Sequence, residues 1–312
     1  MKTRMLFVLL LPFFILTACV SEHPPRLSVG TNQWPGYETL HLANHFGLYD
    51  HHEIKLVELT SATDVINAFR LGHLDVAALT LDEVITVSSQ VPDVVVFLVM
   101  DISNGADKVI AAPSITSASE LVGKKVGVEK TAVGALMFRE FLNYTGLNAE
   151  DLVVIPSTVD QHASMMANHK LDAVVTFSPV SNELLASGHV SLFDSSQIPG
   201  MIVDVLVTRK TTLENKFSSL KKLVEAQWQA LDYLSTKPEE AASIMAPRLK
   251  LSPEALLQTY QELILPDQKQ NQALLGSELK QTAARLNQIM YDTQITRKMV
   301  NAERLITDRM VK

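Results

Sequence analysis

The sequence has a single cysteine, Cys19, among its 312 residues, and this excludes an internal disulfide framework. After the N-terminal segment, no apolar run is long enough to cross a bilayer, which takes about 20 apolar residues in a helix. Basic residues are outnumbered: 27 Lys and Arg against 34 Asp and Glu give a formal net charge of −7. We find no basic cluster, and we therefore expect no nucleic-acid partner, because phosphate recognition requires clustered Lys and Arg.

The motifs of common catalytic sites are also missing. The sequence contains no Gly-x-Ser-x-Gly, no Walker motif and no Cys-His pair. Ser218 and Lys221 match Ser-x-x-Lys, but they lie in an amphipathic segment without the companion motifs of that enzyme class. His41 and His45 are spaced for one face of a helix, yet no Glu accompanies them in a zinc-binding motif. We therefore expect no catalytic residue, no metal site and no cofactor.

The N-terminal segment has the three regions of a secretory signal peptide in order. Lys2 and Arg4 precede an apolar run over residues 5–15, and Leu16-Thr17-Ala18-Cys19 follows. That tetrapeptide resembles the lipobox of bacterial lipoproteins, which implies acylation of Cys19. We expect residues 1–18 to be the signal peptide and 19–26 a lipidated tether, so that the protein is periplasmic and anchored to the bacterial cell membrane. Loss of the two basic residues would bring the net charge to −9. An ordinary cleaved signal that ends near a cysteine is the alternative.

Beyond Leu27, short β-like runs alternate with amphipathic stretches, a pattern typical of α/β layers around a mostly parallel sheet. The length of the remaining chain favours two lobes over one core. Residues 68–80 echo residues 165–176: each has a helix end, a tight turn with Leu-Asp and an apolar strand that ends in a threonine. After Arg209 the pattern changes to long amphipathic helices, the last of which is predicted from Thr296.

Several local patterns carry a family resemblance through their order and spacing. They are Trp34-Pro35-Gly36-Tyr37, Gly47-Leu48, Gly72-His73-Leu74-Asp75, residues 121–128 with the sequence Leu-Val-Gly-Lys-Lys-Val-Gly-Val, Gly146-Leu147, and Leu171-Asp172 with Pro179. From Leu27 to about Thr208 the sequence resembles the NMT1-like binding proteins for nitrate, sulfonates, taurine and thiamine-pyrimidine precursors. Glu129 and Phe177-Ser178 depart from the pattern of the anion-binding members, which bears on the ligand rather than on the fold.

The resemblance implies the type II periplasmic binding fold. Residues 27–108 and 208–312 would form lobe 1 with the C-terminal helices, and residues 109–207 would form lobe 2. The latter range includes two hinge strands near Val109–Ala112 and Ile202–Val207. It also implies a monomer that binds a small molecule and delivers it to an ABC transporter permease and its ATPase.

Ligands of open α/β sheets bind beyond the carboxyl ends of the strands. This rule selects candidate ligand-binding residues from lobe 1, from lobe 2 and from the hinge: Asn32, Trp34, Tyr37, Ser61, Thr80 and Asp101; Glu129, Lys130, Thr131 and Ser178; and Asp204. Thr131 fits either a group that holds an anion at a helix start or a simple N-cap. Trp34 and Tyr37 fit either an aromatic face for the ligand or core packing.

The charge near these strand ends indicates the ligand class. Acidic side chains with few basic neighbours in sequence gather there: Glu38, Asp82, Asp101, Asp107, Glu129 and Asp204. Carboxylates close to a bound charge favour a cation over an anion, so we expect an amine, a cationic heterocycle or a zwitterion. Alternative hypotheses are an anion such as a sulfonate or nitrate, a ligand-sensing partner of a membrane receptor, and an enzyme of the thiamine-precursor branch.

Overall fold

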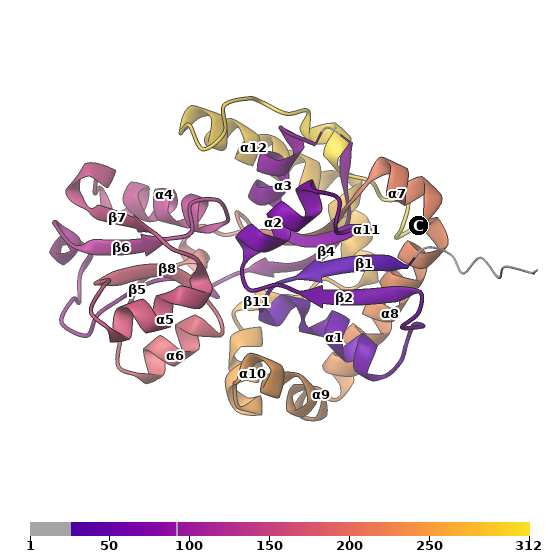
Figure 1. Ribbon diagram of the computed structural model, residues 1–312, viewed down its shortest axis with the longest axis horizontal. Coiled ribbons are helices and arrows are strands. Elements are labelled where there is room, and N and C mark those ends of the chain that lie inside the picture. The colour runs from indigo at the N-terminus through magenta and orange to yellow at the C-terminus, as the bar shows by residue number, and fades with distance from the viewer. Residues whose placement is uncertain (1–25, 92) are drawn as a thin grey trace, which may run out of the picture.

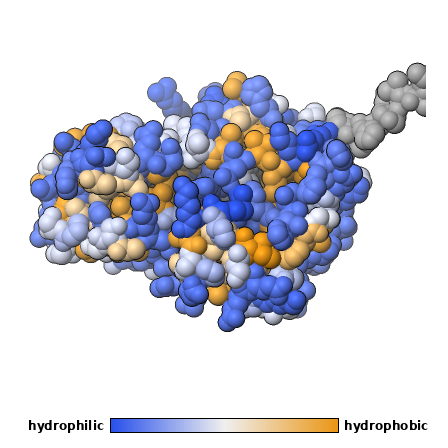
Figure 2. Space-filling model, turned by 60° about the horizontal axis from the view of Figure 1, so that its bottom comes forward, coloured by the Kyte–Doolittle hydropathy of each residue, from blue (hydrophilic) through white to orange (hydrophobic). Residues whose placement is uncertain are grey.

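The computed structural model describes residues 26–91 and 93–312, and it divides them into two α/β lobes (Figure 1). The expected signal peptide, Cys19 and most of the tether lie outside the described residues. The smaller lobe lies at the left of Figure 1 and the larger one, with the C-terminal helices, at the right. The surface seen in Figure 2 is mostly hydrophilic, with hydrophobic patches scattered over it.

Lobe 1 is built on a six-stranded sheet with the order β11-β4-β10-β3-β1-β2. Its strands are β1 (Leu27–Thr31), β2 (Ile54–Glu58), β3 (Val76–Thr80), β4 (Val94–Ser103), β10 (Val203–Arg209) and β11 (Leu263–Ile264). Every residue of β3 is buried, and β4 is buried at all but one position, as expected for strands covered on both faces.

Helices cover both faces of this sheet. The first three are α1 (Glu38–His45), α2 (Ala62–Arg70) and α3 (Leu81–Ser88). The C-terminal part adds α7 (Lys210–Asn215), α8 (Phe217–Thr236), α9 (Pro238–Met245), α10 (Pro253–Tyr260), α11 (Gln268–Ala273) and α12 (Leu279–Asp292). The helix predicted from Thr296 is absent among the described residues. This segment is irregular apart from a short 3-10 helix over Ala302–Leu305, because Ile306 bridges to Val96 of β4 and the chain end is buried there.

Lobe 2 is built on a five-stranded sheet with the order β7-β6-β8-β5-β9. Its strands are β5 (Asp107–Ala111), β6 (Lys125–Val128), β7 (Val153–Pro156), β8 (Ala173–Phe177) and β9 (Val190–Asp194). The helices are α4 (Gly134–Thr145), α5 (Val159–Ala167) and α6 (Val180–Ala186). The two predicted echo segments therefore end in β3 and β8, which occupy matching places in the two lobes.

Both sheets are mixed, and most strands of each sheet run in the same direction. β1 pairs in parallel with β2 and β3, and β6 pairs in parallel with β7 and β8. β10 is antiparallel to β3 and β4, and β5 is antiparallel to β8 and β9, because each of these strands enters its sheet from the opposite lobe. The two-lobed α/β architecture predicted from the sequence is confirmed.

The positions of the interlobe connections differ from the expected hinge strands. β10, expected in lobe 2, belongs to the sheet of lobe 1, and the sheet of lobe 2 already begins at Asp107. The chain crosses between the lobes over residues 104–106 and 195–202. The buried Ser195 links both crossings: its Oγ lies 2.7 Å from Ser103 Oγ and accepts the Gly105 N–H at 2.7 Å.

Candidate functional site

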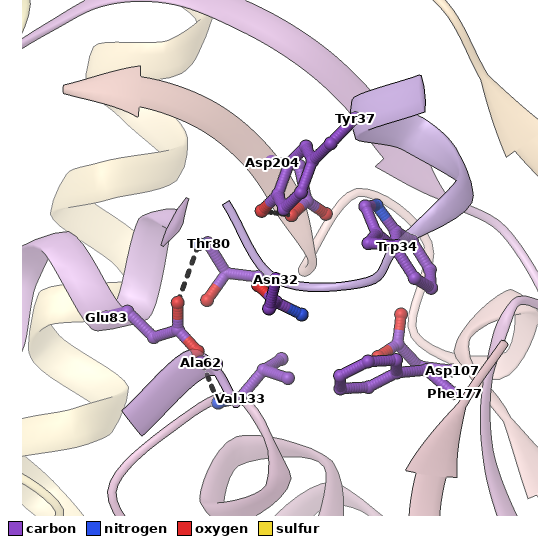
Figure 3. Close-up of a pocket in the computed structure, with 10 residues that line it drawn as sticks. All are labelled: Asn32, Trp34, Tyr37, Ala62, Thr80, Glu83, Asp107, Val133, Phe177 and Asp204. Atoms are coloured by element: carbon purple, nitrogen blue, oxygen red, sulfur yellow. Dashed lines mark hydrogen bonds between the residues drawn. The ribbon is translucent and has the colours of Figure 1, made fainter. Parts of the chain in front are cut away.

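A cavity lies between the lobes, at the carboxyl ends of β1, β3 and β8 (Figure 3). Its walls come from both sheets: Asn32, Trp34, Tyr37, Ala62, Thr80, Glu83 and Asp204 of lobe 1, and Asp107, Val133 and Phe177 of lobe 2. Its volume of about 20 Å³ is room for one or two water molecules. A larger ligand therefore requires the lobes to separate before it can enter.

Two aromatic side chains from the turn after β1 form one wall. The Trp34 indole N–H donates to Asp101 Oδ2 at 3.1 Å, and the Trp34 ring packs edge-on against Phe177 of lobe 2, with ring centroids 5.4 Å apart. The Tyr37 hydroxyl donates to Asp204 Oδ1. The turn requires Gly36, since a Cβ there would lie only 1.7 Å from Asp101 Oδ2. This glycine allows the backbone that carries Trp34 to lie directly on the Asp101 carboxylate.

Three carboxylates line the cavity: Glu83, Asp107 and Asp204. Glu83 is the fourth residue of a Thr-x-x-Glu capping box, and its Oε2 accepts the Thr80 N–H at 3.0 Å. Its Oε1 accepts the Val133 N–H of the other lobe at 2.9 Å. Asp107 Oδ2 and Asp204 Oδ2 are buried and have no hydrogen-bond partner within the described residues. These two oxygens can accept hydrogen bonds from a ligand.

Burial raises the pKa of every member of this acidic group. The pKa of Asp107 rises to about 7 through burial and the charge of Asp82, against the lowering effects of Ser103 and Lys108. Burial and the charge of Asp82 raise the pKa of Glu83 to about 8. Burial and the charge of Asp101 raise the pKa of Asp204 well above its ordinary value. The group therefore retains protons near neutral pH unless a positive charge is brought to it.

The basic side chain next to Asp107 in the sequence is already paired outside the cavity. Lys108 adjoins Asp107, but its Nζ donates to the Gly105 carbonyl and pairs with Glu262 Oε1 at 2.9 Å. No Lys or Arg lines the cavity in the part of the chain that the structure describes. The cavity lining described thus offers no positively charged side chain to an anion.

The structure brings five of the predicted site residues to the cavity: Asn32, Trp34, Tyr37, Thr80 and Asp204. Asp204 lies in β10 opposite Thr80 and Asp101, not in a hinge. Asp101 lies behind Trp34 and does not line the cavity. Their contact with a ligand remains a prediction.

The other predicted residues lie elsewhere. Ser61 is the N-cap of α2, where its Oγ accepts the Asp64 N–H at 3.1 Å, and it lines a neighbouring pocket. Ser178 is buried and lines none of the described pockets. Lys130 and Thr131 are exposed on a wider interlobe cleft of about 300 Å³, since the loop before α4 turns them away from the cavity.

Glu129 lies behind the cavity and connects the lobes. Its Oε1 accepts the Thr63 N–H at 3.0 Å and also the Thr63 hydroxyl, and its Oε2 accepts the Val159 N–H at 3.2 Å. Thr63 Oγ1 also lies 2.6 Å from Thr131 Oγ1. The two lobes are thus joined by direct hydrogen bonds.

The candidate list from sequence missed Glu83 and Phe177, and Asp107 was named only among the acidic side chains near the strand ends. The Thr80-x-x-Glu83 capping box directly after β3 was an available signal for Glu83. Asp107 and Phe177 occupy paired positions at the ends of β5 and β8. Recognising that pairing required the correct start of β5.

The described residues contain neither a candidate membrane span nor a candidate metal site. None of the helices in residues 26–91 and 93–312 combines the length and apolar character needed to span a membrane. Over the same residues, no cluster of three or more His, Cys, Asp or Glu side chains is arranged to hold a metal ion.

The chain is similar to a relative in sequence and to solved structures in fold. A relative in Brucella abortus (strain 2308), named as a binding protein, is 24% identical over 259 residues, which cover 80% of this chain and 79% of the relative. The alkanesulfonate-binding protein SsuA of Xanthomonas axonopodis pv. citri, bound to MOPS, superimposes with a TM-score of 0.76 at 14% identity, over 89% of this chain and 96% of SsuA. A ligand-binding component of an ABC-type import system from Staphylococcus aureus gives 0.77 at 12% identity, over 91% and 97%.

The same fold also occurs in a desulfurization enzyme, DSZB, with a TM-score of 0.68 at 17% identity over 92% of this chain and 97% of the enzyme. At these identities the structures show a shared fold. The sequence itself shows the family: the model of the NMT1-like family matches residues 21–249. That range is well over half of the chain, and the chain belongs to the NMT1-like family.

Proposed function

We propose that this protein is a periplasmic solute-binding protein that captures a small organic molecule between its lobes and delivers it to an ABC importer. The observation that carries the proposal is the cavity at the strand ends, whose walls come from both lobes and where Trp34 meets Phe177. Membership of the family and the names of the fold neighbours agree with it. A ligand that touches both lobes stabilises their closed arrangement by its differential affinity, which gives a transporter a shape to recognise.

The charge of the ligand separates two candidate classes. The sulfonate-binding neighbours favour the anion alternative over the amine or cationic heterocycle that we expected from the carboxylates. The cavity favours a cationic ligand that donates hydrogen bonds, because its charge would favour the ionised form of Asp107 and Asp204, each of which has an oxygen without a partner in the described residues, and because Lys108 is already paired. A zwitterion with an amine and a sulfonate satisfies both observations. We therefore propose a small amine-bearing molecule, with a simple sulfonate as the second candidate.

A matched set of three probes tests both the function and the ligand class. Ethylamine, ethanesulfonate and taurine share a two-carbon chain and carry a positive charge, a negative charge or both. The mature protein without its acyl group would be titrated with each probe by calorimetry and by thermal shift, since a ligand that binds the folded state raises its stability in proportion to ln(1 + [L]/Kd). We expect taurine and ethylamine to bind more tightly than ethanesulfonate. If only ethanesulfonate binds, the ligand class is an anion and not an amine. A lack of response to these probes and to a wider set of small amines and anions would contradict the proposed binding function.

Binding is favoured over catalysis by the state of the side chains. Ser157 and His162 form the closest approach to a nucleophile–base pair, with 3.1 Å between Ser157 Oγ and His162 Nε2. His162 is fully buried, its Nδ1 has no partner within the described residues, and neither side chain lines the cavity. A base without an orienting group and without access to substrate does not fit acid–base catalysis.

The proposal includes a lipid anchor at the N-terminus of the mature protein. Acylation of Cys19 would hold the protein at the membrane beside a permease, and the tether would leave the lobes free to move. A membrane receptor that reads the closed lobes is the alternative partner. Deletion of this protein should abolish uptake of the ligand in the first case and leave uptake intact in the second.

A further inference from the structure

Each lobe contributes one glutamate to the start of a helix in the other lobe. Glu83, on α3 of lobe 1, accepts the N–H of Val133, the N-cap of α4 in lobe 2. Glu129, after β6 of lobe 2, accepts the N–H of Thr63 in the first turn of α2 in lobe 1. Both glutamates are only 3% exposed. The two contacts are reciprocal and involve different helices.

Helix starts carry free N–H groups and a partial positive charge, and they are natural positions for an anion. α4 has no side-chain cap from its own segment, and Glu83 supplies the side-chain oxygen that accepts the N–H at its start. The same carboxylate also holds the Thr80 N–H at the end of β3, and both of its oxygens are therefore engaged (Figure 3).

The position of Glu83 matters because it lines the cavity, whereas Glu129 does not. Across the cavity, Asp107 and Asp204 are each 3% exposed and keep an oxygen without a partner among the residues described. A ligand anion would meet these acids and would find the Val133 N–H already bonded. A cationic ligand with N–H donors would instead favour the deprotonated form of these acids and would bond to their oxygens.

We infer that Glu83 is a specificity-determining residue: it occupies the position at which α4 would otherwise hold a ligand anion, and it restricts the cavity to ligands that donate hydrogen bonds. The inference rests on the proposed function in one respect, that this cavity is where the ligand binds. It assigns the selection of ligand charge to a single side chain.

Glu83→Ala tests the inference, with Asp107→Asn as the matched control. Both variants remove one carboxylate from the same cavity, but only Glu83→Ala frees the N–H groups of Val133 and Thr80. Calorimetric titration with ethanesulfonate and with nitrate should show at least about tenfold tighter binding to Glu83→Ala than to the wild type, as two charge-assisted hydrogen bonds permit. Asp107→Asn should show a smaller gain.

Two results would overturn the inference. One is an equal gain in both variants, which would assign the selection to total charge rather than to Glu83. The other is wild-type binding of ethanesulfonate as tight as that of Glu83→Ala, which would leave the proposed binding function intact. If Glu83→Ala does not fold, Glu83→Gln replaces it. The glutamine side-chain oxygen can still accept one N–H, while the glutamine amide offers a donor to the anion. We expect the same gain in anion affinity over Asp107→Asn. Failure of the binding function itself would appear separately, as a wild type that responds to no small molecule.

Discussion

Replacement of Asp107 by asparagine should make the ligand-free protein more stable at alkaline pH. The side chain is 3% exposed and faces the acidic cavity, and burial raises its pKa from the ordinary 3.8 to about 7. The folded state therefore holds this proton more tightly than the unfolded state, and the wild type loses stability as pH rises from about 4 to about 7. At 1.36 kcal/mol per pKa unit, the loss above pH 7 is about 4 kcal/mol. Asparagine has nearly the same shape and does not ionise.

Urea unfolding of the mature, unacylated protein at pH 4, 6 and 8 measures this effect. We expect Asp107→Asn to be more stable than the wild type by up to about 4 kcal/mol at pH 8 and by less than about 1 kcal/mol at pH 4. Asp232→Asn, at an exposed position on α8, is the control and should give no pH-dependent difference. A difference independent of pH, or an Asp107→Asn protein less stable than the wild type at pH 8, would refute the reasoning.

Two further predictions concern the lobes and the anchor. Glu129→Ala removes the acceptor of the Thr63 and Val159 N–H groups and should lower the population of closed lobes by at least about tenfold. Small-angle X-ray scattering should show a larger radius of gyration for this variant than for Glu150→Ala, which changes an exposed site. An unchanged radius would contradict the role of Glu129. Cys19→Ser should move the protein from the membrane fraction of cells to the soluble fraction, whereas retention in the membrane fraction would argue against acylation.

The strands of lobe 1 could be predicted closely because their signals are local. The runs Leu27–Thr31, Ile54–Glu58 and Val76–Thr80 are short, apolar and rich in β-branched residues, and the structure places strands there. The sheet to which β10 belongs could not be predicted in the same way. Its residues are buried on both faces, so an apolar run of this kind would suit the interior of either lobe.

The candidate site, too, could be predicted from the sequence only in part. The rule of strand ends was sufficient to bring Trp34, Tyr37 and Thr80 to one cavity, since it depends only on where each strand stops. Asp204 joins them because the antiparallel β10 begins at the same edge of the sheet. It gave no means to predict that Glu83 would bond to Val133, because those residues meet only when two separately folded lobes approach each other. Lys130 and Thr131 follow a strand end as well, but the loop before α4 directs them to the outer cleft.

The hydrogen bonds of Ser195 join the two crossings, and this junction is the natural axis for any rotation of one lobe against the other. When two bodies rotate about a common axis, displacement grows with distance from that axis. Asp107 is two residues from Gly105, which is bonded to Ser195, whereas Thr131 lines the outer cleft. A rotation about the crossings would therefore displace Thr131 more than Asp107.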